Sequence, residues 1–266
     1  MTILQAIIIA IVEGLTEYLP VSSTGHMILA TSILGIEPND FVKFFTINIQ
    51  LGAILAVVVL YFKRFFKSFD FYLKLIISFI PAAVLGILFS DKIDELLESP
   101  ETVAVMLLIG GMLLLFIDRF FKEDDENLTE EVSNKSAFII GLYQCVAMIP
   151  GVSRSAATII GGLQQKLTRK AAAEYSFFLA VPTMFGATAK KVLDIYKDKG
   201  LAFFDSDRIF LLAIGNIVAF VVAMIAIKGF ITFLNKHGFR LFGWYRVIVG
   251  GILLLLLGSD MSLSIV

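Results

Sequence analysis

Long apolar runs alternate with short charged segments along most of the chain. Six of these runs, of about 18–23 residues each, are long enough to cross a hydrocarbon layer of roughly 30 Å as α-helices. They cover approximately residues 41–62, 73–90, 102–121, 172–192, 208–229 and 243–260. The pattern therefore predicts an all-α polytopic membrane protein with six transmembrane helices.

Two further apolar regions, residues 3–34 and 136–163, are interrupted by turns that contain proline and serine. The first is broken at Pro-Val-Ser-Ser-Thr-Gly (20–25) and the second at Pro-Gly-Val-Ser-Arg-Ser (150–155). About 10–12 residues follow each break, and a helix of that length rises only ~15–18 Å, which is too short to span. Broken backbone at membrane depth is tolerated only where protein or a water-filled cavity surrounds it. Both regions are therefore expected to be re-entrant helical hairpins.

The two halves of the chain follow the same plan. Each half, about residues 1–121 and 136–260, has one interrupted region followed by three spans, and an acidic linker at about 122–135 joins them. Three is an odd number of crossings, so the second half is expected to lie upside down relative to the first, as in the inverted repeats of many transporters. We expect a single membrane domain over residues 1–266, with the two hairpins meeting near the middle of the membrane.

Lysine and arginine are distributed unevenly between the two sides that this topology defines. Segments on the cytoplasmic side of a membrane protein carry an excess of basic residues. One side has 14 of them, in segments 62–74, 118–136, 164–174 and 228–246, and the other has 7, near residue 43 and in 90–101 and 189–208. The first side is therefore expected to be cytoplasmic, with both termini and the mouth of the first hairpin on the outer face.

Composition supports a protein embedded in a lipid bilayer and excludes several other classes. Hydrophobic residues make up 58% of the chain and charged residues 17%, with a mean hydropathy of +0.88; a soluble domain is about a quarter charged. The net charge of −1 gives no basis for nucleic-acid binding. Cys145 is the only cysteine, and His26 and His237 are far apart. Neither an internal disulfide nor an ordinary Cys/His zinc site is available.

Two carboxylates interrupt the first apolar helix. Glu13 and Glu17 are four residues apart and therefore share one helix face. An ionised residue at mid-bilayer costs at least ~2.5–3 kcal/mol and marks a functional site by default; the alternative is a pair that snorkels to the interface or has a structural role. Four polar residues follow in the turn and the next limb: Ser22, Ser23, Thr24 and His26. The first hairpin is therefore expected to carry functional groups.

The spacing of Ser23 and His26 predicts one specific contact. They are three residues apart, so the imidazole is within reach of the hydroxyl if the limb is helical from the turn onward. This makes them a candidate nucleophile pair. The alternative is that His26 is only a hydrogen-bonded packing residue.

Arg154 lies between Ser153 and Ser155 at the expected start of a helical limb. Backbone N–H groups at a helix start, hydroxyl donors and a guanidinium together suit phosphate oxygens. The sequence of the second interrupted region therefore predicts an anion-binding site. The alternative, which is compatible with it, is that Arg154 neutralises one of the glutamates of the first hairpin.

These two segments carry a resemblance to a known family. The sequences Glu-Gly-Leu-Thr-Glu-Tyr-Leu-Pro-Val-Ser-Ser-Thr-Gly-His (13–26) and Pro-Gly-Val-Ser-Arg-Ser-Ala-Ala-Thr (150–158) resemble the two signature regions of the undecaprenyl-diphosphatase family of bacitracin-resistance type. The resemblance extends over nearly the whole chain, with no departure at the motif positions. It implies hydrolysis of undecaprenyl diphosphate to the monophosphate carrier used in peptidoglycan synthesis, resistance to bacitracin, and a place in the bacterial cytoplasmic membrane.

The resemblance also implies roles for individual residues. A divalent cation, Mg²⁺ or Ca²⁺, is expected on Glu13 and Glu17 through oxygen ligands. The diphosphate is expected on Arg154 and on the hydroxyl groups of Ser22, Thr24, Ser153 and Ser155. Ser23 is the candidate nucleophile, activated by His26 or Glu17, and a metal-bound water is the competing nucleophile.

A different class of function remains open at this stage. Inverted repeats with broken helices are also the architecture of transporters, so the alternative is a polyprenyl-phosphate flippase or a secondary transporter. Two carboxylates, a serine, a histidine and an arginine form a richer set of groups than binding alone requires, which favours the enzyme. The sequence leaves open whether the protein forms a homo-oligomer.

Overall fold

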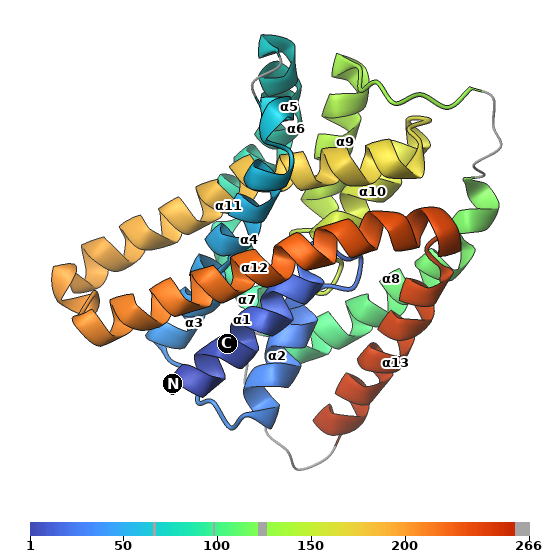
Figure 1. Cartoon of the computed structure of the whole chain (residues 1–266). Helices are drawn as coiled ribbons and strands as arrows, with labels where there is room; N and C mark the ends of the chain where they lie inside the picture. Colours follow the sequence, from blue (N-terminus) through green and yellow to red (C-terminus); the bar gives the residue numbers. More distant parts are fainter. Residues whose placement is uncertain (66–67, 98, 122–126, 259–266) are drawn as a thin grey trace.

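The computed structural model describes residues 1–65, 68–97, 99–121 and 127–258, and this part of the chain is almost entirely helical (Figure 1). The first half contains α1 (Ile3–Thr16), α2 (Ser23–Ile33), α3 (Asp40–Asn48), α4 (Gln50–Leu60), α5 (Phe62–Phe65), α6 (Phe69–Leu88), α7 (Ser90–Leu97) and α8 (Pro100–Phe120). The second half contains α9 (Asn134–Val146), α10 (Arg154–Gln164), α11 (Arg169–Lys199), a short 3-10 helix η1 (Leu201–Phe203), α12 (Ser206–His237) and α13 (Arg240–Leu257). The prediction of an all-α fold is confirmed. Residues 122–126 of the expected linker and the last two residues of the span at 243–260 lie outside the described residues.

The described residues include five helical stretches that are long and apolar enough to cross a membrane: Asp40–Leu60, α6, α8, α12 and α13. They match five of the six predicted spans, so the prediction of a multi-pass membrane protein is confirmed. The sixth, 172–192, lies inside α11, which has 31 residues but is less apolar and contains Glu174 and Ser176. The run at 41–62 is not one regular helix, because α3 and α4 are separated at Ile49.

Both interrupted regions break where the sequence places the breaks. Residues 17–22 separate α1 from α2, and residues 147–153 separate α9 from α10. In each turn the residue directly before the second helix is a serine with positive φ, 68° at Ser22 and 77° at Ser153. Residues other than glycine rarely adopt this left-handed backbone, and the strain often belongs to a functional site. We call α1, its turn and α2 the first hairpin, and α9, its turn and α10 the second hairpin.

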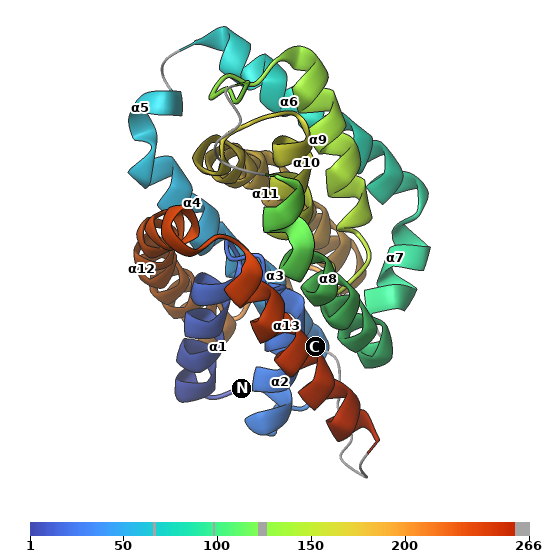
Figure 2. The same ribbon diagram turned by 90° about the vertical axis from the view of Figure 1, so that its right-hand side faces the viewer.

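Helices from one half of the chain pack against helices from the other. α1 lies on α12, α9 lies on α6, and α8 runs alongside α13 (Figures 1 and 2). The helices approach closely: a methyl group added at Gly14 of α1 would be 2.8 Å from the Ala219 carbonyl of α12, and one at Gly141 of α9 would collide with the Ser78 carbonyl of α6. The described helices therefore form one bundle in which the positive-φ serines of both turns, Ser22 and Ser153, are buried.

Large apolar side chains cover much of the outer surface of this bundle. Phe69, Ile87 and Leu255 are more than 70% exposed, and many other leucine, isoleucine and phenylalanine side chains are at least 40% exposed. Soluble monomers rarely expose large contiguous apolar patches. This surface suits contact with lipid chains, as the hydropathy of the sequence predicts.

Candidate active site

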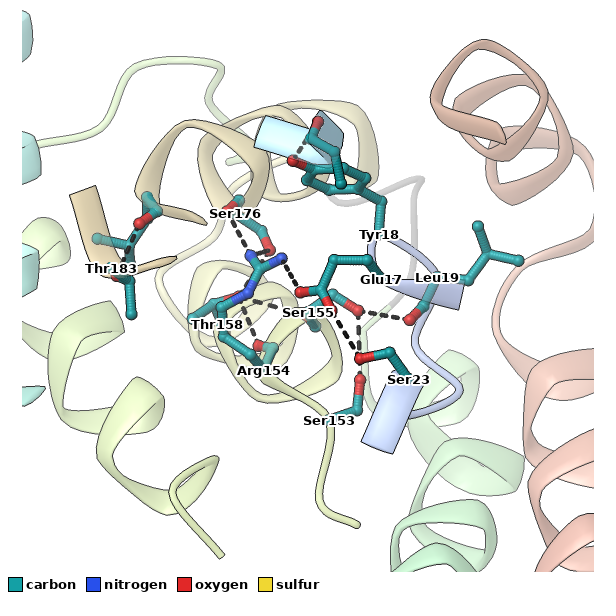
Figure 3. A network of polar contacts seen from close by, with 12 residues as sticks. Glu17, Tyr18, Leu19, Ser23, Ser153, Arg154, Ser155, Thr158, Ser176 and Thr183 are labelled. Carbon is teal, nitrogen blue, oxygen red and sulfur yellow. Dashed lines mark hydrogen bonds and ion pairs between the residues drawn. The ribbon is translucent and has the colours of Figure 1, made fainter. Parts of the chain in front are cut away.

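A chain of polar contacts joins the first hairpin to the second. The Glu17 carboxylate accepts a hydrogen bond from Ser23 Oγ at Oε2 (2.6 Å), and its Oε1 pairs with Nη2 of Arg154 (3.1 Å). Figure 3 shows Ser23 and Arg154 on different sides of this carboxylate. Glu17 and Arg154 are 137 positions apart in the chain. The structure therefore brings together, at one point, groups from both segments that the sequence singled out.

The turn of the first hairpin explains how Glu17 meets Ser23. Glu17 is the residue at which α1 ends, and its N–H bonds to the Glu13 carbonyl (3.0 Å), whereas Ser23 is the first residue of α2. Pro20 lies between them and cannot continue a helix, because it has no N–H and its ring clashes with the preceding turn. The chain therefore reverses within six residues, and the hydroxyl faces back onto the carboxylate.

Contacts from α11 and from the turn of the first hairpin hold the guanidinium of Arg154. Its Nη1 donates to the Ser176 carbonyl of α11 (2.8 Å) and lies 3.4 Å from the Ser176 hydroxyl, which in turn lies 2.7 Å from Thr158 Oγ1 (Figure 3). The ring of Tyr18 lies 5.7 Å from the guanidinium carbon. Arg154 Nε is buried and has no hydrogen-bond partner among the described residues. The side chain is thus fixed in direction while one N–H donor is left available.

The ion pair between Arg154 and Glu17 is shielded from solvent, with side-chain exposures of 12% and 5%. A buried pair of this kind adds little net stability, because the desolvation of two charges offsets their attraction. Removing one partner would leave the other charge buried and uncompensated. The pair therefore serves to orient two functional groups rather than to stabilise the bundle.

The other predicted hydroxyl groups have more local contacts. Ser155 Oγ donates to the Leu19 carbonyl (2.7 Å), which ties the second hairpin to the turn of the first, and Ser153 Oγ lies 3.3 Å from Ser155 Oγ. Ser22 is buried directly before α2, and Thr24 is partly exposed within α2. All four lie within or beside the two turns, next to Ser23 and Arg154 in the chain.

The structure does not bring His26 to Ser23. One ring nitrogen, Nδ1, lies 2.7 Å from the Ser22 carbonyl, and the other, Nε2, lies 2.7 Å from the Tyr245 hydroxyl of α13. A carbonyl only accepts, so Nδ1 carries the proton and Nε2 accepts from Tyr245. Both nitrogens are engaged away from Ser23. Of the two activating groups considered for Ser23, Glu17 is the one that contacts its hydroxyl.

Glu13 lies one helical turn before Glu17, is 1% exposed, and its Oε1 has no hydrogen-bond partner in the part of the chain that the structure describes. An unpartnered buried carboxylate oxygen suits a cation. The described residues contain no cluster of three or more metal-binding side chains. Mg²⁺ is commonly held by one or two carboxylates together with phosphates of the substrate. The residues present therefore fit a cation shared with a phosphate ligand rather than one enclosed by protein alone.

Comparison with known proteins shows which family the chain belongs to. A family described as Bacitracin resistance protein BacA matches residues 6–252. The chain belongs to this family. It is 62% identical over 256 residues to a protein named Undecaprenyl-diphosphatase from Flavobacterium psychrophilum, covering 96% of both chains. A protein of the same name from Porphyromonas gingivalis is 54% identical, with 100% of both chains covered. Another, from Aquifex aeolicus, is 45% identical, with 94% of this chain and 96% of the relative covered.

In this member of the BacA family, some contacts at the site were not foreseen from the sequence. Ser176 carries the carbonyl that fixes Arg154, but nothing around it in the apolar run 172–192 singles it out. Tyr18 lies within the first motif and received no role. Tyr245 lies in the apolar run 243–260, where a tyrosine is typical of the membrane interface, although its hydroxyl donates to His26. The sequence does not single out these two tyrosines, because tyrosine is also common as a packing or interface residue.

Proposed function

We propose that the protein is an undecaprenyl-diphosphatase, which removes the terminal phosphate of undecaprenyl diphosphate to give undecaprenyl phosphate and inorganic phosphate. Membership of the BacA family and the shared name of its full-length relatives support this. The observation that carries the proposal is the position of the Glu17 carboxylate between the Ser23 hydroxyl and the Arg154 guanidinium. Ser23 would be the nucleophile, Glu17 the proton acceptor and Arg154 the phosphate-binding cation. Phosphoryl transfer depends on positioning such groups and stabilising charge.

In the proposed reaction, Ser23 Oγ attacks the terminal phosphorus while Glu17 accepts its proton. The Oγ–P bond forms as the bond from phosphorus to the bridging oxygen breaks, and undecaprenyl phosphate leaves. Water then cleaves the Oγ–P bond: its hydroxyl joins the phosphorus, its proton returns to Ser23 Oγ, and inorganic phosphate leaves. Glu17 releases the proton it accepted to solvent, which restores the starting state. In the competing mechanism a water molecule attacks the phosphorus directly with Glu17 as base, and Ser23 only donates a hydrogen bond.

Arg154 would bind the phosphate oxygens with the N–H donors that face Glu17, while Nη1 stays on the Ser176 carbonyl. Guanidinium forks match phosphate geometry and are fully charged at all relevant pH values. The hydroxyl groups of Ser22, Thr24, Ser153 and Ser155 lie close enough in the chain to add further donors. A divalent cation, Mg²⁺ or Ca²⁺, held by Glu13 and Glu17, would supply neutralisation of the diphosphate charge.

The proposal includes an inverted repeat with two re-entrant hairpins. α1 has 14 residues and α2 has 11, which as helices rise only ~21 and ~17 Å, so neither limb crosses a bilayer alone. Contacts also recur in matched pairs: α1 with α12 corresponds to α9 with α6, and α4 with α12 corresponds to α11 with α6. The positive-φ serine occupies the same place in both hairpins. With the basic side cytoplasmic, the site opens to the outer face, where the released lipid carrier would be recycled for peptidoglycan synthesis and bacitracin would lose its diphosphate target.

The decisive experiment measures phosphate release from undecaprenyl diphosphate by the purified full-length protein in detergent. We expect turnover by the native protein and its loss in Glu17→Gln. Glu131→Gln, which alters an exposed carboxylate on the segment before α9, serves as the matched control and should retain full activity. Absence of release by well-folded native protein would reject the proposal.

The recurring helix contacts also favour a second candidate, a flippase for polyprenyl phosphates, because inverted repeats are common in transporters. Reconstitution into vesicles separates the two functions. Transfer of the phosphorylated lipid between leaflets without phosphate release would identify the flippase.

A further inference from the structure

Arg246 of α13 is the largest fully buried side chain, with no exposed surface. A guanidinium has five N–H donors, one on Nε and two on each Nη. All five are used here, and every acceptor is a backbone carbonyl. The acceptors are Leu107 on Nε (3.4 Å), Pro20 and Val152 on Nη1 (3.2 and 2.9 Å), and Met106 and Gly151 on Nη2 (3.1 and 2.8 Å).

These carbonyls belong to the two turns that form the candidate active site and to α8. Pro20 lies three residues before Ser23, and Val152 lies two residues before Arg154. The single nitrogen Nη1 bonds to both of them. Arg246 therefore joins the turn of the first hairpin directly to the turn of the second, and its bonds to Met106 and Leu107 anchor both turns to α8.

Arg246 has no carboxylate partner in the part of the chain that the structure describes. Burying an unpaired guanidinium is costly unless its donors are satisfied. Carbonyl groups in broken helices at membrane depth are equally costly when unpaired. The guanidinium of Arg246 and the carbonyls of the two turns therefore satisfy one another's hydrogen bonds. A leucine or methionine would avoid burying the charge but would leave these five carbonyls without the arginine's donors.

The packing around the guanidinium is specific. A methyl group added at Gly110 of α8 would collide with Nη2 and Cζ of Arg246. One added at Gly250, in the same α8–α13 interface, would instead meet the Ala104 carbonyl and Leu108 at 3.0 Å and Leu107 Cβ at 3.1 Å, and none of its three nearest atoms belongs to the guanidinium. Gly110 thus makes room for the charged group, and the two glycines form a matched pair for an experiment.

We infer that Arg246 is a positioning residue for phosphoryl transfer, which fixes the spacing of the two turns so that Ser23 and Glu17 act on a phosphate held by Arg154. The inference rests on the proposed active site. Arg246 itself touches no proposed reacting group. Its effect on catalysis comes through the backbone, and a misplacement of about 1 Å is enough to lower a rate by ~100-fold.

The test compares Arg246→Lys and Arg246→Met with the native protein in detergent, with kcat and KM measured per folded molecule. Lysine keeps the charge, but its three donors on one nitrogen cannot reach both turns and α8. We expect kcat to fall at least about 30-fold in both variants. KM should change less than about threefold, because Arg246 bonds only to backbone carbonyls and not to the side chains proposed to bind phosphate. Full activity of Arg246→Lys would show that charge alone matters and would overturn the inference.

Gly110→Ala and Gly250→Ala keep the test decisive if the Arg246 variants do not fold. Gly110→Ala leaves the arginine in place but displaces its guanidinium, so kcat should fall at least about tenfold, whereas Gly250→Ala should stay within twofold of native. Equal activity of the two variants would overturn the inference. Glu17→Gln is measured in parallel: if it is active, the proposed active site fails, and that failure is distinct from a failure of the role of Arg246.

Discussion

The hydroxyl of Tyr245 donates a hydrogen bond to Nε2 of His26 at 2.7 Å, and the two rings stack with an interplanar angle of 4°. Because Nδ1 is bonded to the Ser22 carbonyl, His26 has no nitrogen left for the nucleophile. We predict that Glu17→Gln lowers kcat at least about 100-fold, as loss of a general base does, and that His26→Gln lowers it less than about tenfold. Steady-state phosphate release measures both. A larger loss of kcat in His26→Gln than in Glu17→Gln would indicate that His26, and not Glu17, is the general base.

Replacement of Arg154 by lysine tests bidentate binding of phosphate. A lysine carries the charge but lacks the planar fork, and it cannot contact the Ser176 carbonyl and the phosphate at once. Arg154→Lys should lose at least about tenfold in kcat/KM, which corresponds to ~1.4 kcal/mol for one charge-assisted contact. Arg119→Lys, an exposed position at the end of α8, is the control. Near-native activity of Arg154→Lys would show that Arg154 only neutralises the charge of Glu17 and does not bind phosphate bidentately.

The orientation in the membrane is tested with single cysteines. Asn127 and Asp198 lie on opposite sides in the proposed topology, and both are exposed. In a Cys145→Ser background, a thiol reagent that does not cross membranes should label Asp198→Cys in intact cells and should label Asn127→Cys only after the cells are opened. Labelling of Asn127→Cys in intact cells would show that the orientation is the reverse of the proposed one.

Close packing of α6 and α9 makes a prediction about stability. A methyl group at Gly141 would collide with the backbone of Ser78, which cannot move aside as a side-chain end could. Gly141→Ala should therefore lower the free energy of unfolding by about 1–3 kcal/mol, the usual cost of overpacking. Gly229→Ala has open space around it and should keep or slightly raise the stability, because alanine favours a helix. Thermal unfolding in detergent checks both, and an unchanged Tm for Gly141→Ala would contradict the packing.

The parts of the site that follow from local chain chemistry could be predicted. Pro81 and Pro182 lie inside α6 and α11, so a proline alone does not end a helix in this chain. A proline combined with serine and glycine does favour a break, and this combination predicts both turns. Glu17 and Ser23 flank one such turn and meet across it. The contact between Glu17 and Arg154 does not follow from local chain chemistry, because it depends on how the two halves of the chain pack. Only the predicted inverted repeat pointed to it.

Other contacts depend on tertiary packing that no spacing encodes. Helical spacing allowed His26 to face Ser23, but the ring faces α13, which lies more than 200 positions later in the sequence. Arg246 was counted with the basic residues of segment 228–246, since a charge near the end of an apolar run usually reaches the interface. It is instead fully buried. The break at Ile49 has no proline or glycine at its position, so the pattern of the sequence does not predict it.

The bond from Arg246 to the Pro20 carbonyl, which joins residues 226 positions apart, has a consequence for biosynthesis. Chains grow at about 5–20 residues per second, so roughly 11–45 seconds separate the synthesis of the first turn from that of its arginine. During this interval the growing chain must keep the carbonyls of the turn solvated by water, lipid headgroups or the insertion machinery. Synthesis of α13 is therefore the step that completes the proposed active site, and we expect a nascent chain released before α13 is synthesised to be inserted but inactive.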